Sequence, residues 1–304
     1  MSGLSRRDLL RLTGGAAALG LSGLVQPVWA DTAPCHERPN HCGEWEALAA
    51  YIDTEVLPIP DGNPPPFVPG SPETFATLRQ PYPPVPVWNP PGPKRVGIQA
   101  GHWRYYDSPE ELKNNRFNPG TSGGGKAEWE VNLDISQRVV DRLSELGYVV
   151  DLLDGTPPIR YRAHLFLSIH ADGDVTQQLR GYKVGSARFS ATPEADKALC
   201  DALWEEYGAV TGLQKQPNQV SNRMTGYYAF NSRRYQHAIA PGVPHAIIET
   251  AFLTNPIDRE FLFRQPDRVA KGIVDGLRRF LDSIPPSPRI SLASGATFGA
   301  TYTP

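Results

Sequence analysis

The sequence lacks an excess of charge of either sign and, beyond its N-terminal region, any long hydrophobic run. It contains 30 lysines and arginines against 32 aspartates and glutamates, for a net charge of −2, and no run of basic residues. Nonspecific nucleic-acid binding, which depends on a basic surface, therefore receives no support. No segment after residue 30 reaches the roughly 18 apolar residues of a membrane-spanning helix. The share of apolar residues is ordinary for a globular protein, which argues against a collagen-like or highly charged disordered chain.

Proline, in contrast, is abundant: the chain has 31, about twice the usual share. Fourteen of them lie in residues 58–93. Because proline fixes φ and has no N–H to donate, this stretch cannot form a regular helix or a central strand. We predict that residues 31–93 form an extended, partly polyproline arm, which either wraps around the following domain or spaces it from the membrane.

The first thirty residues have the organisation of an export signal. Adjacent arginines, Arg6 and Arg7, precede the uncharged residues 12–30. A charged start, a mildly apolar stretch and a small final residue are typical of a signal peptide, and the arginine pair indicates the twin-arginine route. We predict cleavage after Ala30, no membrane span thereafter, and a location in the periplasm or outside the cell. The alternative is that the segment is kept as an N-terminal anchor.

The three cysteines fit an oxidising compartment. Cys35 and Cys42 are close in the sequence, and we predict that they form a disulfide. The alternative is a metal site that these cysteines form with His36 and His41, although the spacing matches no common zinc pattern. Cys200 lies among apolar residues of a predicted helix, so we expect a buried, unreactive thiol there.

Short apolar segments alternate with amphipathic ones in the second part of the chain. Apolar residues recur every four positions from Val131 to Leu143, which is the spacing of one buried helix face. Strands that alternate with helices predict an α/β fold, with a mostly parallel central sheet flanked by helices. We place a single domain at residues 94–283 and a loose tail at 284–304. The predicted strands are 96–100, 148–153, 165–169, 181–184, 226–230 and 246–248, and the predicted helices begin near 130, 192 and 269.

Three predicted strands lead to a side chain that can bind a metal or carry a proton. These side chains are His102, His170 and Glu249, and in open α/β sheets sites form at the carboxyl ends of the strands. Glu128 lies just before the helix predicted to begin near Glu130, where the helix dipole favours a carboxylate. Two imidazoles and a carboxylate are typical of a catalytic zinc site with a fourth position for water. We therefore assign His102, Glu128 and His170 to Zn²⁺, and Glu249 to general base and acid catalysis.

Each of these residues also has an ordinary structural explanation. A lone histidine at a strand end is more often hydrogen-bonded within a loop than bound to a metal, and Glu128 and Glu130 could each be a solvated helix start. Glu249 is harder to explain in this way, because it follows a buried strand and carboxylates are rarely buried without a partner. Spacing alone leaves both explanations open.

Four segments resemble, in order, the motifs of the zinc-dependent N-acetylmuramoyl-L-alanine amidases, bacterial enzymes that cut peptidoglycan. The first histidine motif, the glutamate motif, the second histidine motif and the catalytic glutamate segment are similar to GIQAGH (97–102), EWEVNL (128–133), SIHAD (168–172) and IETAFLTNP (248–256). Any one of these motifs is weak, but four in family order are specific. The resemblance covers about residues 95–281, implies a catalytic domain with Zn²⁺ as cofactor, and selects Glu128 over Glu130 as the ligand.

The sequence departs from the family at the mouth of the predicted site. The family usually has Gly-Gly after the first histidine, whereas Trp103-Arg104-Tyr105-Tyr106 follows here. The stretch that leads to Glu128 also looks longer than usual, and the Pro-rich arm has no counterpart in the family's minimal domain. These departures concern the substrate more than the metal.

Residues outside the motifs could contact the substrate. We predict that Trp103 and Tyr227 line a groove for sugar or peptide, with packing beneath a long loop as the alternative. Arg223 could hold a peptide carboxylate. Three histidines match no motif: His164, His237 and His245. We interpret them as structural or surface residues, and His245 is the best candidate among them to support a metal ligand.

The resemblance implies an exported enzyme that hydrolyses the amide between the lactyl group of N-acetylmuramic acid and L-alanine in peptidoglycan. Peptidoglycan is then the partner, and a protein regulator is not identified by the sequence. One alternative keeps the zinc chemistry but acts on another exported peptide or an acylated sugar. Another is a non-catalytic wall-binding protein on the same scaffold, which is disfavoured because all four site positions are filled.

Overall fold

The computed structural model describes residues 82–285 of the chain. The predicted signal peptide, the Cys35–Cys42 disulfide, most of the predicted arm and nearly all of the tail lie outside the described residues. Within the described range, none of the helices is both long and apolar enough to cross a membrane.

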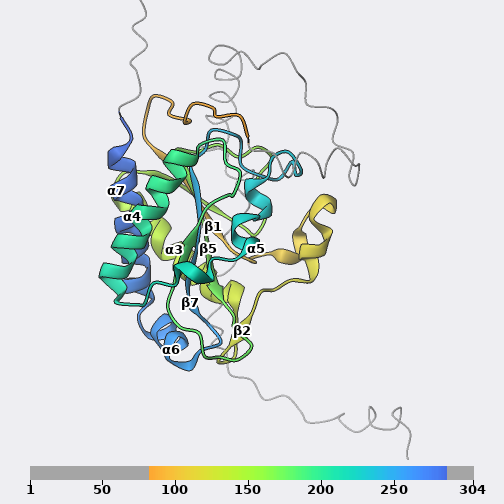
Figure 1. The fold of residues 1–304 in the computed structure, drawn as a ribbon, viewed down its shortest axis with the longest axis vertical. Helices are drawn as coiled ribbons and strands as arrows, with labels where there is room; N and C mark the ends of the chain where they lie inside the picture. The colour runs from red at the N-terminus through yellow and green to blue at the C-terminus, as the bar shows by residue number, and fades with distance from the viewer. Residues whose placement is uncertain (1–81, 286–304) are drawn as a thin grey trace, which may run out of the picture. The chain divides into compact units, whose positions relative to one another are not determined.

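A five-stranded sheet lies at the centre of the described part (Figure 1). Four strands are parallel to their neighbours, and the fifth runs antiparallel at one edge. This arrangement confirms the predicted mostly parallel α/β sheet, and it places four carboxyl strand ends at the same edge. In spatial order the strands are β4 (Val149–Leu153), β1 (Arg95–Ala100), β5 (Leu165–Asp172), β7 (His245–Phe252) and the antiparallel β6 (Lys183–Gly185).

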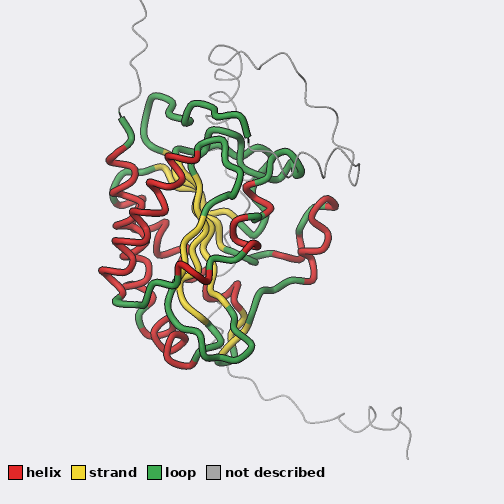
Figure 2. The backbone as a smooth tube through the Cα atoms, viewed as in Figure 1, coloured by secondary structure: helices red, strands yellow, loops and turns green. Residues whose placement is uncertain are grey.

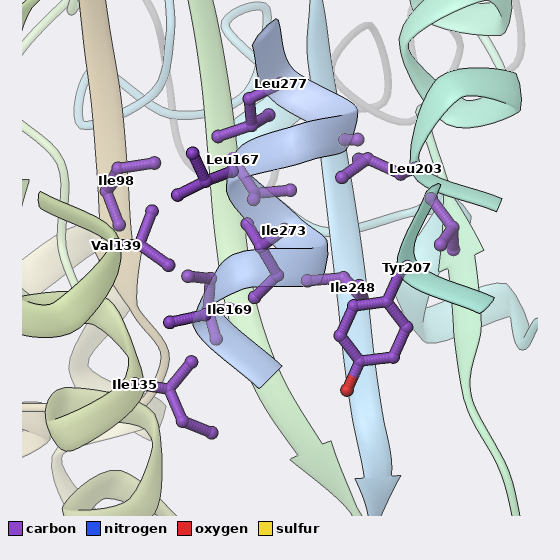
Figure 3. Packing of buried hydrophobic residues seen from close by; sticks show 14 of the residues in the cluster. Ile98, Ile135, Val139, Leu167, Ile169, Leu203, Tyr207, Ile248, Ile273 and Leu277 are labelled. Carbon is purple, nitrogen blue, oxygen red and sulfur yellow. The ribbon is translucent and has the colours of Figure 1, made fainter. Parts of the chain in front are cut away.

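Long helices cover one face of the sheet, whereas the other face carries loops and short helices (Figure 2). The predicted apolar stripe of the first long helix packs on the strands: Ile135 and Val139 lie beside Ile169 and Ile98 in the main core (Figure 3). Burying an aliphatic side chain of this size stabilises the fold by about 1.5–3 kcal/mol. The long helices are α3 (Glu128–Glu145), α4 (Pro193–Thr211) and α7 (Pro266–Ser283).

The loop-covered face has a smaller core of its own. Phe166 and Ile247 of the sheet contribute to it together with Tyr161, Met224 and Phe230 from the covering segments. Successive side chains of a strand project from opposite faces, so the strand residues that alternate with those of the main core project from this face. The short helices that cover it are α5 (Asn222–Thr225) and the 3₁₀ helix η6 (Tyr228–Phe230).

The predicted strand at 226–230 is wrong, because most of this segment forms η6. The N–H of Phe230 donates to the carbonyl of Tyr227, and the N–H of Asn231 donates to that of Tyr228, which is 3₁₀ bonding. A short apolar run can be buried as a strand or as a helical turn, and its periodicity does not separate the two. Tertiary packing of Phe230 in the smaller core decided the outcome.

Two helix boundaries depend on capping. Helix α3 begins at Glu128, two residues before the predicted start, and the side chain of Glu130 accepts a 2.7 Å hydrogen bond from the N–H of Ala127. The sequence analysis did not predict α6 (Pro256–Arg264), whose N-cap Asn255 accepts from the N–H of Ile257. An Asn-Pro pair is a normal helix start, so this signal was available.

The described end of the predicted arm, residues 82–93, lies against the domain. The N–H of Val85 donates to the carbonyl of Ala191 at 3.1 Å, and the N–H of Trp88 donates to that of Gly242 at 2.8 Å. The guanidinium of Arg162 lies 4.9 Å from the centre of the Trp88 ring. This part of the arm therefore packs on the domain.

Candidate active site and metal centre

The three predicted metal ligands converge at the carboxyl edge of the sheet. His102 follows β1, His170 lies near the end of β5, and Glu128 is the first residue of α3. Glu128 Oε1 lies 3.0 Å from His170 Nδ1 and 3.6 Å from His102 Nε2. One ligand atom from each residue lies within 4.8 Å of the others. Side chains separated by up to 68 positions in the sequence thus form one cluster.

The nitrogen of each histidine that faces away from the cluster is also engaged. His102 Nδ1 lies 2.9 Å from the carbonyl of Asn118, to which it can donate. His170 Nε2 lies 3.3 Å from the hydroxyl of Tyr227. These contacts leave His102 Nε2 and His170 Nδ1 directed at Glu128, as ligands to a shared metal require.

The backbone around the cluster has special conformations. His102 adopts a φ of 60°, a left-handed conformation that is uncommon for residues other than glycine and that clusters at functional sites. A Cβ atom at Gly101 would overlap the ring of His170, and one at Gly120 would overlap the carboxylate of Glu128. Glycine is therefore needed at both positions for the ligands to approach.

Glu128 is held ionised. Burial by itself raises the pKa of this carboxyl, but the hydrogen bond from His170, the charges of the two histidines and the N–H of Thr121 outweigh burial and lower the pKa to about 2. The Nδ2 group of Asn132, one helical turn along α3, donates to Glu128 Oε1 at 3.2 Å and to the carbonyl of Gly101 at 2.9 Å. An ionised, oriented carboxylate is the form that binds a metal.

The cluster fits a zinc ion. Two ligands at about 2.1 Å from a tetrahedral zinc lie roughly 3.4 Å apart. The separations from Glu128 Oε1, 3.0 and 3.6 Å, lie on either side of that value, and all three ligand atoms lie within 4.8 Å of one another. Burial lowers the pKa of His102, with Glu128 acting in the opposite direction, and this favours the neutral imidazole that binds metals. Two nitrogens and one carboxylate oxygen are a normal donor set for zinc.

Glu249 lies at the same edge on the neighbouring strand. Its Cα is paired with that of His170 on one side and with that of Lys183 on the other, so the three side chains project from the same face. Glu249 Oε2 is buried and has no hydrogen-bond partner among the described residues. Burial, followed by the charges of Asp172 and Glu128, raises the pKa of Glu249 well above its usual value, whereas Lys183 lowers it.

The two glutamates of the site are therefore tuned in opposite directions. Glu128 is ionised and surrounded by donors, whereas Glu249 binds its proton tightly. Lys183 forms an ion pair with Asp172 beside it. Carboxyl groups whose pKa values are driven apart are typical of paired roles in a catalytic site.

Of the residues predicted to contact the substrate, Tyr227 has a side chain in direct contact with a ligand of the metal cluster. Its hydroxyl is within 3.0 Å of Gln99 Oε1 and 3.3 Å of His170 Nε2, and burial raises its pKa to about 12. Trp103 is half-buried in the turn after His102, and its carbonyl accepts from the N–H of Gly155. Arg223 is exposed on α5.

His245 is a buried structural residue and does not support a metal ligand, the role for which it was the best candidate among the unassigned histidines. His245 is the first residue of β7 and Glu249 comes four residues later, so His245 lies toward the opposite edge of the sheet. Its Nε2 lies 3.4 Å from the carboxylate of Asp196, and its Nδ1 contacts the carbonyl of Val243. No local pattern tells which end of a strand a histidine occupies until the direction of the strand is known.

The sequence analysis missed several residues that hold the site together. Asn132 lies four positions after Glu128, and this helical spacing was a usable signal. Gln99 and Ser168 are fully buried polar residues within strands, which is also unusual. Asn118 acts through its backbone, so its side-chain type carried no signal.

An exposed aromatic residue directly precedes Asn118 in the chain. Phe117 ends the 3₁₀ helix η4 (Glu110–Phe117) and is 86 % exposed, although the next residue, Asn118, holds His102. The segment is fastened at Glu111, whose carboxylate accepts hydrogen bonds from the N–H of Gln236 and of His237. In Figure 1 this segment stands away from the sheet (yellow, right).

Fold and site together place this chain among α/β proteins with a candidate metal centre at the carboxyl edge of a parallel sheet. A model of the Amidase_3 family, described as N-acetylmuramoyl-L-alanine amidase, matches residues 96–279. The match spans more than half of the chain, and the protein belongs to this family.

A curated relative of this chain carries the same description as the family. N-acetylmuramoyl-L-alanine amidase LytC of Bacillus subtilis (strain 168) is 27 % identical over 172 residues, which are 52 % of this chain and 32 % of that protein. The chain thus spans about a third of the length of that curated relative.

Two solved structures are similar to this chain. The N-acetylmuramyl-L-alanine amidase Ami1 from Mycobacterium smegmatis matches with a TM-score of 0.50 and 20 % identity, over 65 % of this chain and all of that chain. The catalytic domain of CwlV from Bacillus (Paenibacillus) polymyxa var. colistinus matches with a TM-score of 0.45 and 23 % identity, over 62 % of this chain and 98 % of that one. At this identity, the likeness to Ami1 supports the fold alone.

Proposed function

We propose that this protein is an exported, zinc-dependent N-acetylmuramoyl-L-alanine amidase that hydrolyses the amide between N-acetylmuramic acid and L-alanine in peptidoglycan. The observation that carries the proposal is the convergence of His102, Glu128 and His170 within 4.8 Å, at the sheet edge that also carries Glu249. Membership in the amidase family supports the choice of substrate.

His102, Glu128 and His170 would hold the zinc ion. A zinc ion bound there supplies a Lewis acid, which polarises a carbonyl group and lowers the pKa of water. The low pKa of Glu128 keeps that ligand ionised throughout the neutral range. The contacts of Asn118 with His102 and of Asn132 with Glu128 limit the movement of both side chains, so the ligands are positioned before the substrate arrives.

Glu249 moves the proton. Hydrolysis adds water to the amide carbonyl carbon, breaks the C–N bond, and transfers one proton of the water to the departing amine of L-alanine. Glu249 accepts that proton and passes it on, as base and then as acid. Its raised pKa favours the accepting step, and the charge of Lys183 acts in the opposite direction.

The substrate would lie across the mouth of the site. Trp103 and the ring of Tyr227 are proposed to contact sugar or peptide, and Arg223 to meet a peptide carboxylate. To these we add Phe117, because its exposed ring precedes the residue that contacts His102, and an exposed ring can pack on the apolar face of a sugar. In this proposal the longer stretch between His102 and Glu128, which contains Phe117, contributes to substrate binding.

Export and the state of the N-terminal region complete the proposal. Peptidoglycan lies outside the cytoplasmic membrane, so an amidase must be exported to reach it, which agrees with the twin-arginine signal proposed for residues 1–30. The Cys35–Cys42 disulfide is proposed on the same basis, since that compartment is oxidising. Mass analysis of the mature protein would show a start at Asp31 and a mass two hydrogens below the reduced form.

The experiment that tests the function is digestion of purified sacculi. We expect the purified domain to release peptides with a free N-terminal L-alanine, to lose this activity with a zinc chelator, and to regain it with added zinc. The variant Glu249→Gln should be inactive, and Glu260→Gln, at an exposed carboxylate on α6, should be unaffected.

Three other outcomes would contradict parts of the proposal. Release of other fragments would point to another peptide or an acylated sugar as the substrate. Binding to sacculi without turnover would favour a non-catalytic wall-binding protein. Full activity of the Glu249→Gln variant would exclude Glu249 as the proton carrier.

A further inference from the structure

A buried chain of polar side chains lies behind His170. Gln99 of β1 and Ser168 of β5 are fully buried on the loop-covered face, and Tyr227 and Tyr228 reach them from the loop layer. Tyr227 is also in edge-to-face contact with His170, with the ring centres 5.5 Å apart. The chain leads from the metal cluster to the carbonyl of Gly155.

The direction of each hydrogen bond follows from the far end of this chain. Tyr228 donates to the carbonyl of Gly155, so its oxygen accepts from Gln99 Nε2 at 3.2 Å. The amide oxygen of Gln99 then faces the other way and accepts from Ser168 at 2.8 Å and from Tyr227 at 3.0 Å. A tyrosine hydroxyl has one proton to donate, and Tyr227 donates it to Gln99. Only a lone pair of Tyr227 remains for His170 Nε2.

We infer that Tyr227 is a positioning residue that accepts a hydrogen bond from His170 Nε2 and thereby directs the lone pair of His170 Nδ1 to the metal. The inference rests on the zinc site of the proposed function. When Nδ1 is a metal ligand, the ring of His170 carries its only proton on Nε2. His170 is buried, and a buried N–H without an acceptor is costly.

The two histidine ligands are thus oriented by different means. His102 relies on a backbone carbonyl, that of Asn118, which no single substitution removes. His170 relies on a side-chain hydroxyl, which the change Tyr227→Phe removes without altering the ring that packs against it. The role of Tyr227 can therefore be tested with little disturbance of the fold.

The experiment compares zinc affinity in the wild-type chain, Tyr227→Phe and a matched control, Tyr161→Phe. Tyr161 belongs to the smaller core of the same face, and its hydroxyl donates to Asp151. Asp151 is paired with Gly97 of β1, five residues before His102, so this hydrogen bond is not made to a metal ligand. Affinity is measured by competition with a colorimetric zinc chelator, and thermal unfolding of the metal-free proteins shows that each variant is folded. We expect a 10- to 100-fold weaker affinity for Tyr227→Phe and no change for Tyr161→Phe.

A second measurement reports on the hydrogen bond itself. In the zinc-bound wild-type protein, the Nε2 proton of His170 should exchange slowly with solvent in NMR spectra, and in Tyr227→Phe it should exchange faster. An unchanged zinc affinity and an unchanged exchange rate in Tyr227→Phe would overturn the inference while leaving the zinc site intact. A wild-type protein that binds no zinc would overturn both the inference and the proposed metal centre.

Discussion

The two faces of the central sheet differ in the elements that cover them and in the residues that they bury. Three long helices bury an aliphatic core on one face, in which residues such as Ile273 and Leu277 are fully covered (Figure 3). The other face carries loops, a smaller core and the buried pair Gln99 and Ser168. It also carries Glu249, whose Oε2 has no hydrogen-bond partner among the described residues. Polar groups buried in this way lower stability unless each one is bonded. Stability is thus concentrated on the helix face, and chemistry on the loop face.

The largest expected effect is on activity, and it should come from Glu249→Gln on the loop-covered face. The substitution keeps the shape of the side chain but removes the group that transfers the proton, so we expect kcat on peptidoglycan fragments to fall about 10³-fold. The measurement is release of free L-alanine amines, with Glu260→Gln on the surface as the control. Retention of more than a tenth of the activity would contradict the assignment.

The next largest effect should come from the helix face and appear in stability alone. Ile273→Ala removes fully buried methyl groups between α7 and the sheet, and we expect the free energy of unfolding to fall by about 2–4 kcal/mol. The kcat per folded molecule should remain within about twofold, because no residue of the site is touched. Denaturant unfolding and active-site titration with zinc check the two halves of this prediction. A large loss of kcat in a fully folded sample would show that the faces are coupled.

A smaller effect concerns the stability of the metal-free protein as pH changes. The folded-state pKa of Glu249 is raised above its unfolded value near 4.5, so the folded protein binds more protons and loses stability as pH rises through the window between the two values. Glu249→Gln does not titrate there. We expect this variant to be more stable than wild type at pH 7, with a higher Tm, and equally stable below about pH 4.

Thermal scans in the presence of a chelator from pH 4 to pH 8 give the measurement. A constant difference across this range would mean that the gain comes from packing and not from ionisation. A less stable variant at pH 7 would show that Glu249 has a favourable partner in solution. The expected gain in stability for Glu249→Gln at pH 7 is typical of replacing a functional residue that lowers the stability of the fold.

The smallest effect should come from the rim of the loop face. Phe117→Ala removes an exposed ring, so stability should change little, but we expect KM for glycan-containing substrates to rise about 3- to 10-fold at nearly constant kcat. Leu146→Ala is the matched control, because this exposed residue follows the last turn of α3, about 27 Å from Glu128. Equal KM values for Phe117→Ala and wild type would remove Phe117 from the substrate site.

Much of this division could be predicted from local patterns. The four-residue spacing on α3 and the apolar runs of β1, β5 and β7 depend on neighbours in the chain, and the structure confirms these elements. The loop face was predicted less well, because its helices are single turns with no repeated spacing. The segment at 226–230 shows the difference: its residues are apolar enough for a strand, but packing against Phe166 and Ile247 buries them as a helical turn.

The sequence by itself determined the sheet, the long helices and four chemical groups of the site. His102 follows β1, Glu128 begins α3, and His170 and Glu249 are paired in the C-terminal halves of the parallel strands β5 and β7, so the direction of the chain brings all four toward one edge. Only the tertiary structure decided how they are oriented. Tyr227 meets Gln99 across 128 positions, and Asn118 holds His102 through a carbonyl that every residue possesses. Such contacts leave no local trace in the sequence, because they depend on the path of the loops and not on the residues that flank them.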